Sequence, residues 1–284
     1  MPITFGTEGW RAVMAETFTF DNVRTVTQAV AEHVQATTHR RSALTMAVGY
    51  DTRFLSEGFA RAVCEVLAGN RIRCVLTDRA IPTCAVSRIV VDHHLPAGMM
   101  VTASHNPPIY NGLKVKESYG GSATTQSVAS IERRLNHSRV KRLAFDDAQH
   151  AGLIIRENFM PKFLKGIRGY VDLPAIRRAN ITVIVDSMHG TGGRIIEGLL
   201  AGGRCRVTTL HGEPDPLFGG QAPEPIPSHL GQLARTVART HAHVGLANDG
   251  DADRLGLIGP GGTWLNPGQV MCVILAHLVT SRRM

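Results

Sequence analysis

Thr102-Ala103-Ser104-His105-Asn106-Pro107-Pro108 is the stretch that decides the fold, and an apolar run, 97–101, leads into it. The apolar run predicts a strand, and the small and polar residues after it predict a sharp loop. The residue before each proline is pushed away from helical angles, so the loop cannot continue as a helix. Ser104 is therefore expected at the carboxyl end of a strand, where open α/β sheets place their ligands.

A serine at such a position has three ordinary uses. Its hydroxyl caps a helix, bonds within a turn, or acts as a nucleophile that carries a phosphoryl group. Taken alone, Ser104 favours the first two. A second stretch, 145 positions further along, shifts the balance towards the third.

The second stretch is Asn248-Asp249-Gly250-Asp251-Ala252-Asp253-Arg254, which follows an apolar run, 244–247. Its three alternate carboxylates converge on one cation if the chain curls, and Gly250 permits the curl. Oxygen ligands alone select a hard ion, Mg²⁺ or Ca²⁺. An EF-hand calcium loop is excluded, because Arg254 replaces its glycine and Pro260 its final glutamate. A solvated acidic turn is disfavoured, because carboxylates this close repel one another unless a cation lies between them.

Together the two stretches predict an Mg²⁺ ion bound by Asp249, Asp251 and Asp253, with a phosphate on Ser104 completing its coordination. Both stretches resemble motifs of the α-D-phosphohexomutases, the phosphoglucomutase/phosphomannomutase family. Members carry a T-A-S-H-N-P phosphoserine loop and a D-G-D-x-D-R metal loop. Two further stretches match the family in its order, Phe5-Gly6-Thr7-Glu8-Gly9-Trp10-Arg11 and Tyr110-Asn111-Gly112-Leu113-Lys114. The resemblance covers about residues 3–270 and only the N-terminal portion of such enzymes.

The resemblance implies roles for individual residues. Ser104 would carry the phosphoryl group, and Lys114 or His105 would move the proton of the sugar hydroxyl. Arg11 and Arg254 would supply positive charge near the phosphate. Arg11 is also predicted to be a catalytic residue. The remaining residues assigned to substrate or phosphate binding are Thr7 and Asn106. Glu8 stands where the family commonly has serine and is assigned no contact.

Strand-like and helix-like segments alternate along the chain, which is typical of a mostly parallel sheet covered on both faces. The expected strands are 45–50, 74–77, 99–102, 181–185, 206–210, 244–248 and 254–258. The expected helices are 22–36 (capped by Asp21), 56–68, 83–92, 125–135, 157–170, 194–200, 230–240 and 267–279. Asn111-Gly112 predicts a turn, with Leu113 to Lys116 in a hairpin beside the serine loop.

These segments define the fold class as α/β, with two successive α/β/α mixed-sheet domains plus the start of a truncated third. The polar, weakly periodic segment 137–152 predicts the boundary between the first two. The expected limits are 1–142 for domain I with the phosphoserine loop, 153–262 for domain II with the metal loop, and 263–284 for the third. A glycine-rich turn, 186–193, precedes a helix and predicts a structural turn rather than a phosphate site.

Composition narrows the class of protein. A length of 284 residues with 43% hydrophobic content allows two globular domains. No apolar run reaches the length of a membrane helix, and the start shows no signal-peptide pattern. The five cysteines are scattered without a C-x-x-C pair, which predicts a reducing cytoplasm rather than a disulfide framework or a zinc site.

The net charge of +8 is dispersed and is accompanied by only 5% aromatic residues. A nucleic-acid binder usually concentrates its basic residues and adds stacking aromatics, so nucleic acid is not an expected partner. The arginines form solvated faces and help to attract anionic sugar phosphates. The expected partner is therefore a hexose phosphate, of glucose or mannose.

The resemblance also predicts what the chain lacks. Family members are longer, and their sugar-reading loop and phosphate-gripping domain have no counterpart here. The helix expected at 267–279 would keep an uncovered apolar face, which predicts a complementing chain, a repacked helix or a homo-oligomer contact. Three functions stay open: a mutase subunit, an intramolecular phosphotransferase that works when the missing half is supplied; a truncated non-mutase remnant that binds metal and is phosphorylated; or a regulatory partner of a full-length mutase.

Overall fold

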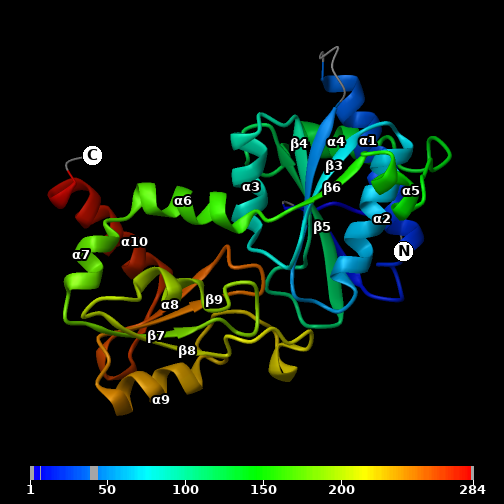
Figure 1. Ribbon diagram of the computed structural model, residues 1–284. Coiled ribbons are helices and arrows are strands. Elements are labelled where there is room, and N and C mark those ends of the chain that lie inside the picture. Colours follow the sequence, from blue (N-terminus) through cyan, green and yellow to red (C-terminus); the bar gives the residue numbers. More distant parts are fainter. Residues whose placement is uncertain (1–2, 7, 39–43, 283–284) are drawn as a thin grey trace. The chain divides into compact units, whose positions relative to one another are not determined.

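The computed structural model describes residues 3–6, 8–38 and 44–282, and its chain divides into two compact units. Unit 1 is Met1–Tyr170 and unit 2 is Val171–Met284 (Figure 1). Among the residues that the structure describes, each unit contains a mixed sheet, of six strands in unit 1 and five in unit 2. Within the described ranges, none of the helices combines the length and the apolar character that crossing a membrane requires.

The sheet of unit 1 is built from β1 (Trp10–Val13), β2 (Thr45–Tyr50), β3 (Arg73–Thr77), β4 (Ala97–Val101), β5 (Tyr110–Glu117) and β6 (Ile154–Glu157). Their order is β1-β5-β4-β2-β3-β6. β2 pairs in parallel with β3 and β4, and β3 pairs in parallel with β6. β5 runs antiparallel to both β1 and β4. The central strands are apolar on both faces, as a sheet covered on both sides requires.

Helices cover both faces of this sheet (Figure 1). On one face lie α1 (Phe20–Thr37), α2 (Ser56–Gly69), α4 (Thr125–Glu132) and α5 (Phe145–His150), which share the larger apolar core. On the other face lies α3 (Thr83–Asp92), joined by the start of α6 (Met160–Tyr170) in a second core. The predicted α/β/α arrangement of this part of the chain is confirmed.

Two local predictions in unit 1 were wrong. Thr19, not Asp21, caps α1, because its Oγ1 accepts a hydrogen bond from the N–H of Asn22. Asn111-Gly112 is not a turn but lies inside β5. Position 112 requires a residue without a side chain, because a Cβ would lie 2.5 Å from the carbonyl oxygen of Thr102 and 2.7 Å from that of Trp10.

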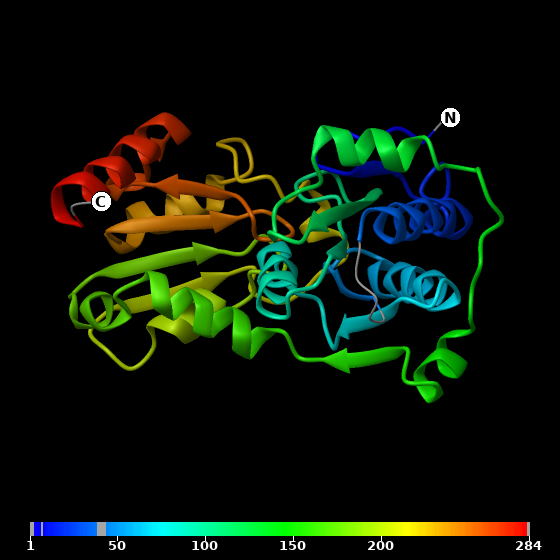
Figure 2. The same ribbon diagram turned by 90° about the horizontal axis from the view of Figure 1, so that it is seen from above.

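The segment predicted as a domain boundary belongs to unit 1. Figure 2 shows the chain between α4 and α5 passing along the outside of that unit. Two of its main-chain N–H groups hold it there: that of Lys141 donates to the side-chain oxygen Oε1 of Gln28, and that of Leu143 donates to the carbonyl oxygen of Glu65. The following β6 then adds to the sheet, so unit 1 continues to Tyr170. The domain limits 1–142, 153–262 and 263–284 themselves remain a prediction.

Unit 2 contains β7 (Thr182–Asp186), β8 (Arg206–Leu210), β9 (Val244–Asn248), β10 (Leu255–Ile258) and β11 (Trp264–Leu265). Their order is β11-β10-β9-β7-β8, with parallel pairing of β7 to β8 and β9 and antiparallel pairing beyond β9. α9 (Gly231–Thr240) packs its apolar side on this sheet through Leu233 and Val237. α7 (Leu173–Arg178) and α8 (Ile195–Leu200) lie on the opposite side (Figure 1).

The last α-helix, α10 (Pro267–Ala276), buries none of its side chains. Met271, Val273 and Leu275 are 70%, 67% and 62% exposed. The predicted uncovered apolar face is therefore present. What covers it stays a prediction, as does the assignment of this segment to a third domain.

Candidate active site

The Ser104 loop lies at the carboxyl end of β4, where the sequence placed it. β2 and β4 are parallel neighbours with Tyr50 opposite Val101, so both strands end at the same edge of the sheet. Asp51 follows β2 and Thr102 follows β4, and the Thr102 hydroxyl donates a hydrogen bond of 2.7 Å to Asp51 Oδ2. Two strand ends are therefore joined directly beside Ser104.

Ser104 has a left-handed backbone, with φ of 55°. Such a conformation costs a residue with a Cβ about 1–2 kcal/mol, so the surroundings must impose it. The N–H of Ser104 donates to Thr102 Oγ1 at 2.8 Å, and its carbonyl oxygen accepts from Arg53 at 2.8 Å. Both main-chain polar groups of the candidate nucleophile are thus fixed.

Arg53 lies against the Ser104 loop and binds its main chain. The sequence analysis assigned this residue no role. Its side chain is buried and donates to four carbonyl oxygens, those of Ser104, Asn106, Pro107 and Tyr110. Its Nε lies 3.2 Å from Asp51 Oδ2. Burial raises the pKa of Asp51, and the charge of Arg53 with the hydroxyl bonds opposes that rise.

Two further predicted residues, Arg11 and Lys114, lie on the strands beside this loop. Arg11 on β1 donates from NH1 to Asn106 Oδ1 at 2.8 Å. Lys114 on β5 lies opposite Met100 of β4 and is buried. Glu8, which was assigned no contact, pairs with both cations through Oε2, at 3.6 Å from Arg11 and 3.7 Å from Lys114. A phosphate that binds these cations would compete with that carboxylate.

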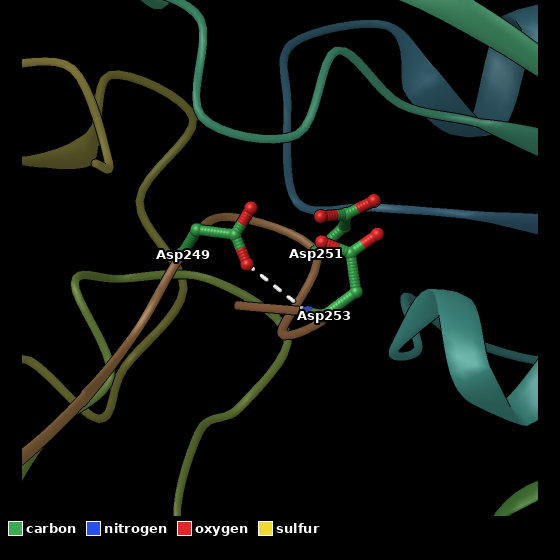
Figure 3. Close-up of side chains that lie close together, drawn as sticks. All are labelled: Asp249, Asp251 and Asp253. Carbon is green, nitrogen blue, oxygen red and sulfur yellow. Dashed lines mark hydrogen bonds between the residues drawn. The ribbon is translucent and has the colours of Figure 1, made fainter. Parts of the chain in front are cut away.

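In unit 2, the three predicted metal ligands are gathered on one loop between β9 and β10. Asp249, Asp251 and Asp253 each offer a carboxylate oxygen, and these oxygens all lie within 4.8 Å of one another (Figure 3). Asp249 and Asp251 are fully buried, and Asp253 is exposed. Burying carboxylates this close together is costly without a cation, so the oxygen-only donor set fits a hard divalent ion.

The loop curls for a different reason from the one predicted. Gly250 does not have a positive φ; the left-handed residue is Ala252, with φ of 55°. Asp249 Oδ1 accepts the N–H of Asp253 at 3.0 Å (Figure 3). It also accepts the N–H of Arg254 at 3.0 Å, and the two bonds hold the curl. One oxygen of Asp249 therefore shapes the loop by binding main-chain N–H groups.

Gly250 is instead a point of close packing against the glycine-rich turn, 186–193. Thr191 N–H donates to the Gly250 carbonyl oxygen at 3.0 Å. A Cβ on Gly190 would lie 2.6 Å from that oxygen and 2.8 Å from the Gly250 Cα. This contact supports the structural interpretation of the turn, because its glycine allows the metal loop to approach.

Gly190→Ala is expected to weaken metal binding roughly 10-fold, because the added methyl group displaces the backbone between two ligands. The measurement is calorimetric titration of Mg²⁺ or Mn²⁺ into the purified chain. Gly198→Ala is the matched control, since nothing lies within 4 Å of a Cβ there and alanine favours α8. Equal metal affinity in the two variants would show that the turn does not support the loop.

The structure thus places the predicted site residues in two groups, one in each unit. Unit 1 holds Ser104, His105, Asn106, Arg11 and Lys114, and unit 2 holds the three aspartates with Arg254, whose side chain is exposed. Thr7 lies outside the described residues. The residues missed were Asp51 and Arg53, and their signal was an Asp-x-Arg pattern directly after a parallel strand.

Comparison with known proteins covers both units. The family models described as phosphoglucomutase/phosphomannomutase alpha/beta/alpha domain I and domain II match residues 2–141 and 161–262. A "Probable phosphoglucosamine mutase" of Methanothermobacter thermautotrophicus is 32% identical over 89% of this chain and 54% of its own length. A "Phosphoglucomutase/phosphomannomutase" of Thermococcus kodakarensis is 28% identical over 95% of this chain and 58% of its own length.

A solved structure, titled as that of a "putative phosphomannomutase" from Thermus thermophilus, has a TM-score of 0.88 and 34% identity, covering 100% of this chain and 62% of that one. The chain spans about half the length of the curated relatives it matches, 54% and 58% for the two above. The two family models follow one another along the chain, and the four motifs of the family fall within or beside them. The chain belongs to the α-D-phosphohexomutase family, the phosphoglucomutases and phosphomannomutases.

Proposed function

We propose that this chain carries the phosphoryl-transfer machinery of a hexose phosphate mutase, with Ser104 as the phosphoryl carrier. The observation that supports this most directly is the fixed Ser104 loop, in which both main-chain polar groups of the serine are bound. Such preorganisation serves a nucleophile, because a correctly held oxygen needs no rearrangement before it reacts. Membership of the family and the neighbouring cations of Arg11 and Lys114 agree with the assignment.

The proposed reaction has two balanced halves. In the first, the bond between phosphorus and Ser104 Oγ breaks, and a bond forms from phosphorus to a hydroxyl oxygen of the hexose phosphate. The hydroxyl proton passes to Lys114 or His105, and the sugar becomes a bisphosphate. In the second half, the bisphosphate has reoriented and returns the phosphoryl group of its other position to Ser104 Oγ, while the base returns the proton to the sugar oxygen.

Asp249, Asp251 and Asp253 would hold Mg²⁺, and a phosphate oxygen on Ser104 is proposed as a further ligand. When bound, Mg²⁺ neutralises negative charge on the oxygens of the transferring phosphoryl group. Arg11, Asn106 and Thr7 are proposed to bind the phosphate. Arg254, the residue after Asp253, is proposed to add positive charge.

The substrate is proposed to be a phosphate of glucose, mannose or glucosamine, since the relatives carry names of all three kinds. A complementing chain or a second copy is proposed to take part in turnover, since α10 leaves apolar side chains exposed. Cytoplasm is proposed as its compartment, since all five cysteines are free thiols.

The test is incubation of the purified chain with glucose 1,6-bisphosphate and Mg²⁺, followed by intact-mass measurement and mapping of the modified residue. One phosphoryl group on Ser104 is the expected result. Conversion of glucose, mannose and glucosamine 1-phosphates is then assayed with and without a candidate complementing chain. Phosphorylation without conversion would favour a remnant, and co-purification with a full-length mutase would favour a regulatory partner. No phosphoryl group on Ser104 would overturn the proposal.

A further inference from the structure

We propose that Arg53, braced by Asp51, is the positioning residue that sets the backbone of the Ser104 loop for phosphoryl transfer. The residues involved are 104–110 and the strand end after β2, and the expected effect on phosphoryl transfer rests on the proposed role of Ser104. Arg53 acts through the loop and not on the phosphoryl group. Its effect is therefore expected on the rate of transfer rather than on the affinity for the sugar.

The first observation is the number and spread of the bonds that Arg53 makes. NH1 donates to the carbonyl oxygens of Pro107 and Tyr110 at 2.8 and 2.9 Å, and NH2 to those of Ser104 and Asn106 at 2.8 and 2.6 Å. These bonds use the planar fork of a guanidinium, whose donors have fixed directions. Lysine has a single nitrogen with three donors, so it cannot reproduce four acceptors over this span.

The second observation concerns charge. A carbonyl oxygen carries partial negative charge, and a phosphoserine at pH 7 carries about −1.5 to −2. The bonds to Arg53 occupy four carbonyl oxygens of the loop, among them that of Ser104 itself. None of the four can turn towards a phosphate on Ser104 without first breaking a charge-assisted bond. Arg53 thereby lowers the electrostatic cost of carrying the phosphoryl group.

The third observation is that the carboxylate of Asp51 holds Arg53 and the end of β4 together. Asp51 Oδ2 lies 3.2 Å from Arg53 Nε and accepts the hydroxyl of Thr102 at 2.7 Å. Asp51 Oδ1 accepts the Arg53 N–H at 3.0 Å and the Ser56 hydroxyl at 2.7 Å. Since Thr102 Oγ1 in turn accepts the N–H of Ser104, one network holds both the N–H and the carbonyl oxygen of the nucleophile. The left-handed φ of Ser104 is imposed by this network.

A second Asp-Arg pair in unit 1, which within the described residues makes no contact of this kind with the serine loop, can be compared with Asp51 and Arg53. Asp78 and Arg79 follow β3, the parallel neighbour of β2. Arg79 is bound to the carboxylate of Asp78, and its side chain is 62% exposed. The side chain of Arg53, by contrast, is 0% exposed and bound to the main chain of the serine loop. Arg79 therefore provides a matched control for the same substitution.

The experiment compares Arg53→Lys with Arg79→Lys in the full chain. The rate of phosphoryl uptake by Ser104 from glucose 1,6-bisphosphate is measured by quenched intact-mass analysis over a range of bisphosphate concentrations. Arg53→Lys is expected to lower the maximal rate by about 100-fold, the size expected when a reacting group is displaced by about 1 Å. The bisphosphate concentration that gives half the maximal rate is expected to change less than about threefold, because Arg53 does not contact the bisphosphate and its binding is retained.

Hydrogen exchange supplies a readout that does not depend on activity. The N–H groups of Asn106 and Tyr110 are bonded inside the loop, to the carbonyl oxygens of Ala103 and Pro107. In Arg53→Lys their exchange is expected to be at least about 10-fold faster, with the N–H of Cys74 on β3 unchanged. If Arg53→Lys does not fold, Thr102→Val replaces it; this variant removes the link from Asp51 to Ser104, and the same changes are expected at about 10-fold in rate.

Failure of the proposal for Arg53 can be distinguished from failure of the proposed function. Uptake as fast as in Arg79→Lys, or loop exchange at the wild-type rate, would overturn the proposal for Arg53. A rise in the half-maximal concentration without a fall in the maximal rate would also overturn it, since that is the signature of lost substrate binding. If the wild-type chain takes up no phosphoryl group, the proposed function fails, and the exchange measurement alone decides whether Arg53 sets the loop.

Discussion

Ser104→Ala is expected to abolish phosphoryl uptake from glucose 1,6-bisphosphate while the chain remains folded. The hydroxyl oxygen is the atom that would form the bond to phosphorus, so no other part of the loop can replace it. Alanine is chosen rather than glycine because it keeps a Cβ on a residue with φ of 55°. The backbone strain is then unchanged, and the melting temperature is expected to stay within a few degrees. The measurement is intact mass after incubation with bisphosphate and Mg²⁺.

The control for this variant is Ser118→Ala, which changes an exposed serine in the turn after β5. It is expected to take up one phosphoryl group at the wild-type rate. Uptake by Ser104→Ala equal to that of the control would place the carrier elsewhere in the chain. The assignment of Ser104 would then fail even though the family membership stands.

Asp251→Asn is expected to weaken Mg²⁺ binding by at least about 100-fold, more than the loss of an outer-shell partner produces. Asn keeps the shape of the side chain and one oxygen, but removes the negative charge that a hard cation favours. Asp251 is chosen over Asp249 because one oxygen of Asp249 also binds the N–H groups of Asp253 and Arg254. Metal affinity is measured by calorimetry, and phosphoryl uptake is expected to fall to the level seen with EDTA.

The matched control is Asp172→Asn, the same change at the N-cap of α7 in the same unit. Asparagine caps a helix as well as aspartate does, so stability and metal binding are expected to be unchanged. Affinity for Mg²⁺ in Asp251→Asn equal to that of this control would mean that the triad does not bind the ion. Unchanged uptake with lost metal binding would instead separate the metal loop from the chemistry of Ser104.

The strands and helices that carry the site were predictable because their signals are local. Thr45–Tyr50 and Val244–Asn248 are short apolar runs that end in polar residues, and both strands have the predicted limits. The antiparallel start of β5 was missed, because Asn111-Gly112 is a typical turn pair and only the tertiary contacts of Gly112 place it in a strand.

The site itself was predictable only in part. Its reactive groups occur in motifs, so Ser104 and the three aspartates were found from the sequence. Arg53 was missed because its partners are main-chain carbonyl oxygens, more than 50 positions away, and these carry no side-chain signature. The role of Gly250 was missed for a similar reason, since its close neighbour is Gly190 on another loop. Contacts made through the backbone cannot be inferred from residue type alone.

The short strand β6 has a consequence for any attempt to divide the chain. It supplies the outermost partner of β3, pairing Cys74 with Ile154 and Thr77 with Glu157. A polypeptide cut at residue 142 would leave the amide and carbonyl groups along that side of β3 without their ladder. An open, apolar sheet edge of this kind recruits strands from other molecules, which leads to aggregation or domain swapping. Solubility of the N-terminal half therefore depends on a strand that lies beyond the segment predicted as the domain boundary.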